Sequence, residues 1–222
     1  MGSRGESREP DRAIRARGGL GRTLDRRHCP RAGAAVRPGA LKGLSRGYGD
    51  RVGVRYSARQ IEAAIERLAG QLTADLAELN PVVVVLLKGS FMFAADLVRK
   101  LDFPLQLEFL AQKSYFGRQS SGLLEQTLNL TGPVRGRHVL VVDDISDTAY
   151  SIDQTVSYLK SLGPASLRTC CLLERIRDDA GFSVDYVGIR AEPGFLIGYG
   201  LDLDQEWRNL PFIGLLEEPD GA

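Results

Sequence analysis

The sequence predicts an α/β domain in which a mostly parallel sheet is flanked by helices. Two continuous apolar runs, residues 81–87 (PVVVVLL) and 139–142 (VLVV), are typical of strands that are buried on both faces. Each run is followed by a polar turn and then by apolar residues at helical spacing, which is the order of a strand–helix–strand unit. A chain of 222 residues has room for one such domain and a tail.

The composition argues against several classes of protein. No stretch approaches the ~20 apolar residues that cross a membrane, and the first residues lack the apolar segment of a secretory signal. The cysteines are Cys29 and the neighbours Cys170 and Cys171, with no CxxC spacing. An odd count in this placement argues against a disulfide framework or a zinc site. We therefore expect a cytoplasmic protein that has no membrane partner.

Residues 1–53 are expected to form a disordered basic tail, separate from a folded domain at 54–222. The tail has 13 Lys and Arg against 5 Asp and Glu, whereas the remainder has 16 against 23. It is rich in Arg and Gly and has no apolar period, so it cannot offset its ordering entropy by burial. Three explanations are compatible with it: a leader from an upstream start codon, a tail that touches nucleic acid or phosphate, and a transit peptide.

The folded part is expected to begin with a helix. Ser57 followed by Gln60 is a capping-box pattern, and apolar residues then recur at helical spacing up to residue 79. The strand at 81–87 follows and ends at Lys88 and Gly89. These two residues suit an oxyanion, because glycine lets the backbone approach and lysine brings charge, although such turns are common. The inward face of the next helix is expected to consist of Phe91, Ala94, Ala95, Val98 and Leu101.

The remaining strands are short and follow one another between turns. A polar hairpin at residues 112–122 separates two of them. Further strands are expected at residues 105–110, 123–130, 167–173, 184–189 and 212–216.

Residues 139–151 (VLVVDDISDTAYS) carry the strongest functional pattern. The strand ends at Asp143 and Asp144, Asp147 follows, and a helix to residue 161 begins after a run of small polar residues. Ligands of open α/β sheets bind at the carboxyl ends of strands, and a helix N-terminus attracts anions. We therefore expect this loop to hold a phosphate and the acids to hold a cation or hydroxyl groups. The plainer alternative is a turn in which aspartates cap the helix, but a cap does not require three acids.

A second informative string is FLIGYGLD at residues 195–202. It is expected to be a strand that ends in an acid. Phe195 can stack on a flat base, and Asp202 can ligate Mg²⁺ together with substrate oxygens. Core packing is the alternative for Phe195.

These strings resemble the type I phosphoribosyltransferase family, and in particular its bacterial hypoxanthine-type members. Residues 143–151 are similar to the family's binding motif for 5-phosphoribosyl-1-pyrophosphate (PRPP), and residues 86–97 (LLKGSFMFAADL) resemble its pyrophosphate loop. The resemblance covers about residues 55–217. It implies the type I phosphoribosyltransferase fold, with a small hood region beside the sheet. It also implies purine salvage: transfer of the 5-phosphoribosyl group from PRPP to hypoxanthine or guanine, giving IMP or GMP and pyrophosphate.

The resemblance also assigns roles to residues. Asp147 is implied as the general base, and Ser114 and Tyr115 match a pair in the hood that closes over the ribose. Mg²⁺ is the implied cofactor, with Asp143, Asp144 and Asp202 as metal ligands. The purine site is implied to consist of Glu174, Phe195, Leu196 and Asp202. PRPP is implied to bind to Lys88, Gly89, Asp143, Asp144, Ile145, Ser146, Thr148, Ala149, Tyr150, Ser151 and Arg208. Family members often form dimers or tetramers, so we expect a homo-oligomer, and no nucleic acid as partner.

Two residues depart from the family pattern. Glu174 stands where a lysine of the family donates to the 6-oxo group of the purine, and an ionised carboxylate cannot donate. Either Arg175 or Arg177 supplies the donor, or the base preference has changed. Ala149 replaces a glycine; a positive φ there would cost about 1–2 kcal/mol, whereas a negative φ would leave its N–H available to a phosphate.

Two other functions stay open at this point. One is phosphoribosyl transfer to another purine, such as xanthine or an aminopurine. The other is a non-catalytic PRPP or nucleotide sensor that binds RNA, which the basic tail favours, whereas Asp147 and the FLIGYGLD string favour an enzyme. A GTPase-like phosphate binder is excluded because the sequence has no GxxxxGK[ST] motif.

Overall fold

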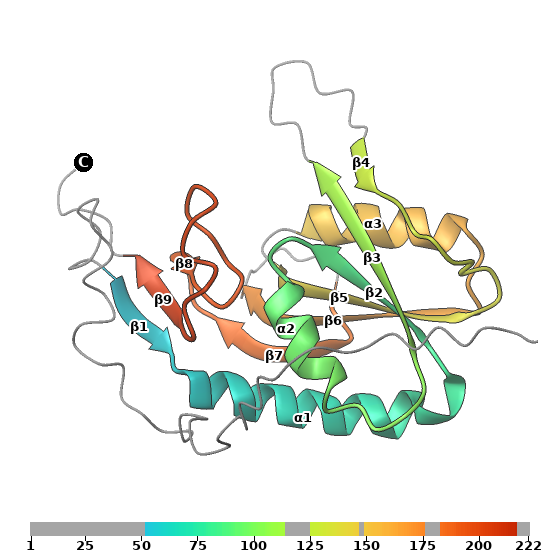
Figure 1. The fold of residues 1–222 in the computed structure, drawn as a ribbon, viewed down its shortest axis with the longest axis horizontal. Helices are drawn as coiled ribbons and strands as arrows, with labels where there is room; N and C mark the ends of the chain where they lie inside the picture. Colours follow the sequence, from blue (N-terminus) through green and yellow to red (C-terminus); the bar gives the residue numbers. More distant parts are fainter. Residues whose placement is uncertain (1–51, 114–124, 147–148, 176–182, 217–222) are drawn as a thin grey trace, which may run out of the picture. The chain divides into compact units, whose positions relative to one another are not determined.

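A mostly parallel sheet carries the site residues in the computed structural model, which describes residues 52–113, 125–146, 149–175 and 183–216 (Figure 1). Within these residues, one sheet has six strands in the order β4-β3-β2-β5-β6-β7. Adjacent strands are parallel, except that β4 is antiparallel to β3. The predicted parallel α/β sheet is therefore confirmed. Its strands are β2 (Val82–Leu87), β3 (Gln106–Lys113), β4 (Glu125–Leu128), β5 (His138–Ser146), β6 (Ser166–Arg175) and β7 (Tyr186–Ala191).

Helices cover both faces of this sheet (Figure 1). Helices α1 (Ala58–Leu76) and α2 (Phe91–Val98) pack in one cluster with Val83 and Val85 of β2. Helix α3 (Ala149–Ser161) lies on the other face, where it packs against Val82 and Val84. Alternate residues of one strand thus face different helices, which explains why the strand is apolar throughout.

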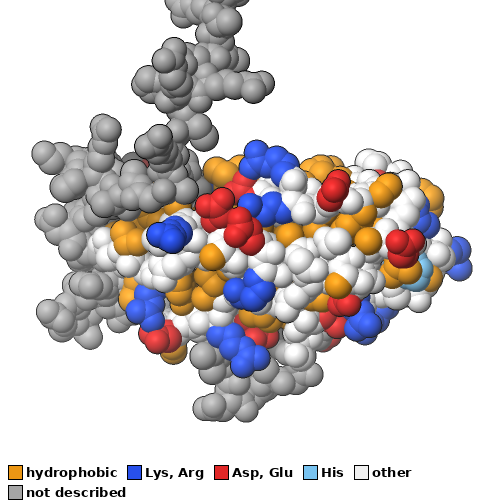
Figure 2. Space-filling model, turned by 90° about the horizontal axis from the view of Figure 1, so that it is seen from below, with side chains coloured by type: hydrophobic (Ala, Val, Ile, Leu, Met, Phe, Trp, Pro, Cys, Tyr) orange, Lys and Arg blue, Asp and Glu red, His pale blue; other side chains and the backbone are white. Residues whose placement is uncertain are grey.

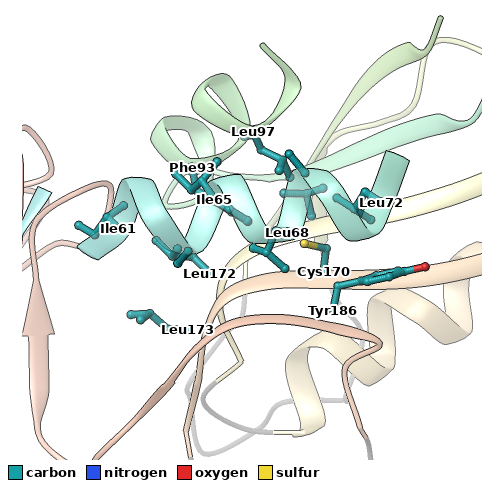
Figure 3. Packing of buried hydrophobic residues seen from close by; sticks show 14 of the residues in the cluster. Ile61, Ile65, Leu68, Leu72, Phe93, Leu97, Cys170, Leu172, Leu173 and Tyr186 are labelled. Carbon is teal, nitrogen blue, oxygen red and sulfur yellow. The ribbon is translucent and has the colours of Figure 1, made fainter. Parts of the chain in front are cut away.

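Helix α1 begins where the sequence predicts. The N–H of Gln60 donates to the Ser57 hydroxyl, and the N–H of Ser57 donates to the Gln60 side chain (3.0 Å), which completes the capping box. A single 3₁₀ turn, Ala77–Leu79, ends the helix. Figure 3 shows the apolar stripe of α1 lying over β6 and β7, with Leu68 close to Cys170 and Tyr186.

The outer face of α1 carries charges of both signs. Figure 2, seen from the α1 side, shows basic and acidic side chains interspersed with apolar ones. Lys100, just after α2, places its Nζ 3.3 Å from Glu66 and 3.8 Å from Glu62 of α1. Exposed pairs of this kind contribute little to stability, so the apolar stripe holds the helix in place. No helix among the described residues is both long enough and apolar enough to cross a bilayer.

The predicted inward face of α2 is confirmed at Ala94 and Leu101, which are buried, and at Val98, which packs against the core, but it is wrong at Phe91 and Ala95. The buried residues are Phe93, Ala94 and Leu97, whereas Phe91 is 39% exposed and Ala95 is also exposed. Nearly every position of this helix is apolar, so two neighbouring stripes fit helical spacing equally well. Packing against α1 decides between them.

A second sheet joins the two ends of the described chain. It has the order β1-β9-β8, all antiparallel, and consists of β1 (Val52–Tyr56), β8 (Phe195–Ile197) and β9 (Ile213–Leu216). The sequence did not predict β1, and Val52 and Gly53 belong to it and not to the expected tail. Val52 is buried beside Ile197 and Phe212, so the strand depends on partners far along the chain. The prediction for residues 1–51 lies outside the described residues.

Strand β8 is shorter than the predicted strand at 195–202. The three residues after Ile197 all have positive φ: Gly198 at 93°, Tyr199 at 50° and Gly200 at 102°. Such angles cannot continue a strand, so the chain turns before it reaches Asp202.

Candidate functional site

A cavity of about 360 Å³ lies at the carboxyl ends of the parallel strands, where ligands of such sheets bind. Residues from three separate sequence motifs meet there: Gly89 follows β2, Asp144 lies near the end of β5, and Phe195 belongs to β8. The lining consists of Gly89, Asp144, Ile145, Arg175, Phe195, Leu196, Leu201, Asp202 and Arg208. Among these, Leu201 was not singled out from the sequence, although it belongs to the FLIGYGLD string.

Asp143 and Asp144 belong to the end of β5, which runs on to Ser146. Burial raises the pKa of Asp143 well above its ordinary value, and the charge of Asp144 raises it further. Burial also raises the pKa of Asp144, although hydrogen bonds from Asp143 and from the N–H of Ile145 (2.9 Å) oppose this. Two adjacent, desolvated carboxyls of this kind favour a partner that brings positive charge or hydroxyl donors.

Lys88 and Gly89 form the turn between β2 and α2, and the Leu87–Lys88 peptide bond is cis. A Cβ at position 89 would lie 1.7 Å from Oδ2 of Asp144, so any larger residue here would have to displace this carboxylate. Lys88 is not part of the cavity lining; its Nζ donates to Oε1 of Gln205 at 3.4 Å. Lys88 therefore reaches the loop that carries Asp202.

Asp202 and Arg208 form an ion pair at the cavity, with 2.7 Å between Oδ1 and Nη2. The other oxygen of Asp202 accepts the N–H of Gln205 at 2.9 Å. Arg208 also donates through Nη1 to the carbonyl of Gly200 at 2.7 Å. The arginine is thus held in place before any anion binds, and Gln205 is a contributor that the sequence did not reveal.

The carboxylates do not by themselves form a complete metal cage. In the described part of the chain, no group of three His, Cys, Asp or Glu side chains is close enough to hold a metal ion. Asp144 and Asp202 nevertheless line the same cavity. Two carboxylates with an open approach fit Mg²⁺, which usually retains waters and binds substrate phosphates in addition to one or two protein carboxylates.

Phe195 and Leu196 form the apolar part of the lining. Phe195 is 47% exposed, so it is not a core residue, whereas Leu196 is buried, with an exposed fraction of 6%. An exposed aromatic ring beside a polar cavity is suited to stacking on a planar ligand.

Glu174 and Arg175 end β6 and have different surroundings. Oε2 of Glu174 lies 3.6 Å from Nε of Arg190 on β7, and Glu174 is not part of the cavity lining, although the sequence placed it in the purine site. Arg175 does line the cavity. Arg175, one of the two donors considered in place of the family's lysine, is therefore at the cavity, and Arg177 lies outside the described residues.

The expected phosphate loop is described only in part. Ala149, Tyr150 and Ser151 form the first turn of α3, and a helical residue has negative φ, so the strain considered for Ala149 does not arise. Ile145 and Ser146 are the last residues of β5 before this loop. The predictions for Asp147, Thr148, Ser114 and Tyr115 lie outside the described residues.

Comparisons with known proteins agree on one family. Residues 56–203 match the family described as "Phosphoribosyl transferase domain". The chain is 40% identical over 174 residues to the hypoxanthine phosphoribosyltransferase of Haemophilus influenzae, covering 75% of this chain and 97% of the relative. It is 38% identical over 167 residues to the hypoxanthine-guanine-xanthine phosphoribosyltransferase of Tritrichomonas foetus, covering 74% and 91%. A solved hypoxanthine phosphoribosyltransferase of Staphylococcus aureus superimposes with a TM-score of 0.71 at 32% identity, covering 76% and 93%.

Proposed function

Because the chain belongs to the phosphoribosyl transferase family, we propose that it is a purine-salvage enzyme that transfers the 5-phosphoribosyl group of PRPP to hypoxanthine or guanine, giving IMP or GMP and pyrophosphate. The family and fold expected from the sequence are confirmed by these matches. One observation supports the function most strongly: a single cavity is lined by Gly89, Asp144, Phe195 and Asp202, which come from three separate strings of the sequence.

In the proposed complex, the sugar phosphate lies along the carboxyl ends of β2 and β5. The hydroxyl groups of the ribose donate to the carboxylates of Asp143 and Asp144, which relieves the unfavourable burial of their charge. The 5-phosphate binds to the backbone N–H groups and hydroxyls of residues 147–151, because the N-terminus of a helix such as α3 leaves N–H groups free to bind an anion. Pyrophosphate is held by Lys88, by the backbone of Gly89 and by Arg208.

Mg²⁺ fits the cavity through Asp202 and Asp144. When bound, it supplies positive charge that neutralises the leaving pyrophosphate. Both oxygens of Asp202 already accept hydrogen bonds, from Arg208 and from Gln205. The Arg208 side chain and the backbone N–H of Gln205 would therefore share the carboxylate with the ion.

Transfer proceeds by positioning and electrostatic stabilisation. The bond from C1 of the ribose to pyrophosphate breaks, and its electron pair leaves with pyrophosphate. A ring nitrogen of the purine forms the new bond to C1, and its N–H proton passes to Asp147 as general base. Phe195 stacks on the purine, and the carboxylates of Asp143 and Asp144 stabilise the positive charge that develops on the sugar.

Domain extent, assembly and location follow as further parts of the proposal. The phosphoribosyltransferase domain begins with β1 at Val52, two residues before the boundary expected from the sequence, and follows a basic tail. The protein forms a homodimer or homotetramer, which is supported by apolar side chains left exposed on β3 and α2: Leu107 at 42%, and Phe109 and Phe91 at 39% each. The buried free thiols of Cys170 and Cys171 suit a reducing cytoplasm.

The test is a base panel with the purified chain. PRPP and Mg²⁺ are offered with hypoxanthine, guanine, xanthine or adenine in turn, and nucleotide formation and pyrophosphate release are both measured. Hypoxanthine and guanine are expected to react. Asp147→Asn should keep PRPP binding and lower turnover by about 10²-fold or more. Binding of PRPP without reaction of any base would contradict the enzyme and favour a sensor.

A further inference from the structure

The loop after β8 contains a bulky residue in an unfavourable backbone conformation. Tyr199 has a φ of 50° and stands between two glycines that also have positive φ. A side chain with a Cβ rarely adopts such an angle unless its surroundings hold it there. Hydrogen bonds within the loop provide part of this support: the N–H of Tyr199 donates to Leu210 O, and that of Gly200 donates to Arg208 O, each at 2.9 Å.

A second support comes from outside the loop. The Tyr199 hydroxyl donates to Oδ2 of Asp96 on α2, with 2.5 Å between the oxygens. Asp96 itself forms an ion pair with Arg99 one turn further along the helix. Burial raises the pKa of Tyr199, and the bond to Asp96 raises it further, so the phenol stays protonated as a donor. Tyr199 thus ties the loop after β8 to the helix after β2.

The residue after Tyr199 touches both halves of the site. A Cβ on Gly200 would lie 2.0 Å from the carbonyl oxygen of Gly89, and Gly89 in turn lies against Asp144. The carbonyl of Gly200 accepts a hydrogen bond from Arg208, which pairs with Asp202. Gly200 is therefore fixed between the turn at Gly89 and the Asp202–Arg208 pair.

We propose that Tyr199 is a positioning residue that sets the spacing between the Lys88–Gly89 turn and the Asp202–Arg208 pair by holding Gly200 between them through its hydrogen bond to Asp96. The role rests on the proposed function, because these two elements are the ones assigned to pyrophosphate and metal. Asp96 belongs to the helix that begins two residues after Gly89, so the bond joins the segment that carries the Lys88–Gly89 turn to the loop that carries Gly200. Loss of the Tyr199–Asp96 hydrogen bond should weaken the binding of PRPP with Mg²⁺ and change the binding of the base little.

Tyr199→Phe removes the hydroxyl and keeps the ring, so the core stays filled. We expect the KM for PRPP to rise about 10-fold, in line with a lost hydrogen bond to a charged group, and the KM for the base to change less than about 2-fold. Asp96→Ala should raise the KM for PRPP by a similar factor. The double variant, Tyr199→Phe with Asp96→Ala, should have no higher KM for PRPP than Asp96→Ala alone. Asp96→Asn keeps an acceptor oxygen and should remain near the wild type.

The chain contains a matched control for this bond. The Tyr186 hydroxyl donates to Oδ2 of Asp75 at 2.7 Å, between β7 and α1, and neither residue lines the cavity. Tyr186→Phe should lower the melting temperature as Tyr199→Phe does, and leave both KM values unchanged. The positioning role would be overturned if Tyr199→Phe and Tyr186→Phe changed the KM values equally. It would also be overturned if Tyr199→Phe raised the KM for PRPP and the KM for the base by the same factor.

A ligand-binding measurement separates this inference from the proposed function. The rise in melting temperature on addition of PRPP and Mg²⁺ should be smaller in Tyr199→Phe than in the wild type or in Tyr186→Phe. This comparison needs no turnover. If the wild-type chain is inactive but its melting temperature still rises more than that of Tyr199→Phe, the transferase is refuted and the positioning role stands. Identical shifts of the melting temperature in all three chains would refute the positioning role.

Discussion

Gly200→Ala is the substitution for which the structure gives the clearest expected magnitude. The added Cβ would lie 2.0 Å from the carbonyl oxygen of Gly89, whereas ordinary contacts begin at 3.4 Å. Backbone faces backbone at this point, so no side-chain rotation relieves the overlap, and the two segments must separate by about 1.4 Å if the loop alone moves. A misplacement of about 1 Å in a catalytic site can lower the rate by about 10²-fold. We therefore expect kcat/KM to fall by at least about 10²-fold.

The φ of 102° at Gly200 would also strain an alanine, so the control must carry that penalty without the overlap. Gly136→Ala meets this need, because Gly136 has a φ of 70° and its added Cβ would meet nothing within 4 Å. Gly136→Ala should lose about 1–2 kcal/mol of unfolding free energy in urea, and Gly200→Ala should lose at least as much, because it adds the overlap to the φ penalty. Only Gly200→Ala should lose activity in the pyrophosphate-release assay. A kcat/KM of Gly200→Ala within about threefold of that of Gly136→Ala would show that the close approach of Gly200 to Gly89 is not needed for activity.

Three further changes test other parts of the molecule. Phe195→Ala should raise the KM for the base about 5- to 150-fold in steady-state kinetics, because stacking contributes about 1–3 kcal/mol per base. Gly70→Ala, at an exposed position inside α1 with nothing within 4 Å, should raise the unfolding free energy in urea by about 0.5–1 kcal/mol. Asp143→Asn should melt at a higher temperature than the wild type at pH 7. The raised pKa of Asp143 in the folded state means that its protonated form is the stabilising one; this stability is present below about pH 4 and is lost as the pH rises through the folded-state pKa. The difference between the two melting temperatures should therefore disappear in acid, and an equal difference at all pH values would contradict the cause given.

Local sequence patterns predicted those elements that are determined by residues close together in the chain. Ser57 and Gln60 marked the start of α1, and the unbroken apolar run of β2 followed from burial on both faces. The meeting of Asp144 with Gly89 followed from the rule that parallel strands present their carboxyl ends at one edge of the sheet.

Other features depend on contacts that the sequence does not display. Strand β1 exists because Val52 pairs with Leu216, more than 160 positions away, and its five residues carry no pattern strong enough to reveal it. The end of β8 depends on three successive residues with positive φ, and Tyr199, which lies between the two glycines, is a residue type that does not signal a turn. Whether Glu174 or Arg175 faces the cavity depends on how the final residues of β6 are oriented, and residue type alone does not specify this orientation.

The contact between Gly89 and Gly200 shows how close packing and ligand binding are coupled in this site. Without a Cβ at either position, the two loops approach until Gly89 lies against the carboxylate of Asp144. The same crowding removes water from Asp144 and Asp143 and raises the pKa of both, so the unliganded site holds carboxyls that are poorly compensated at neutral pH. A ligand that brings hydroxyl donors or a cation relieves this cost and stabilises the folded chain in the same step. Substitutions that separate the loops should therefore make the unliganded protein less sensitive to pH while they weaken its response to PRPP, because water would then reach the carboxyls.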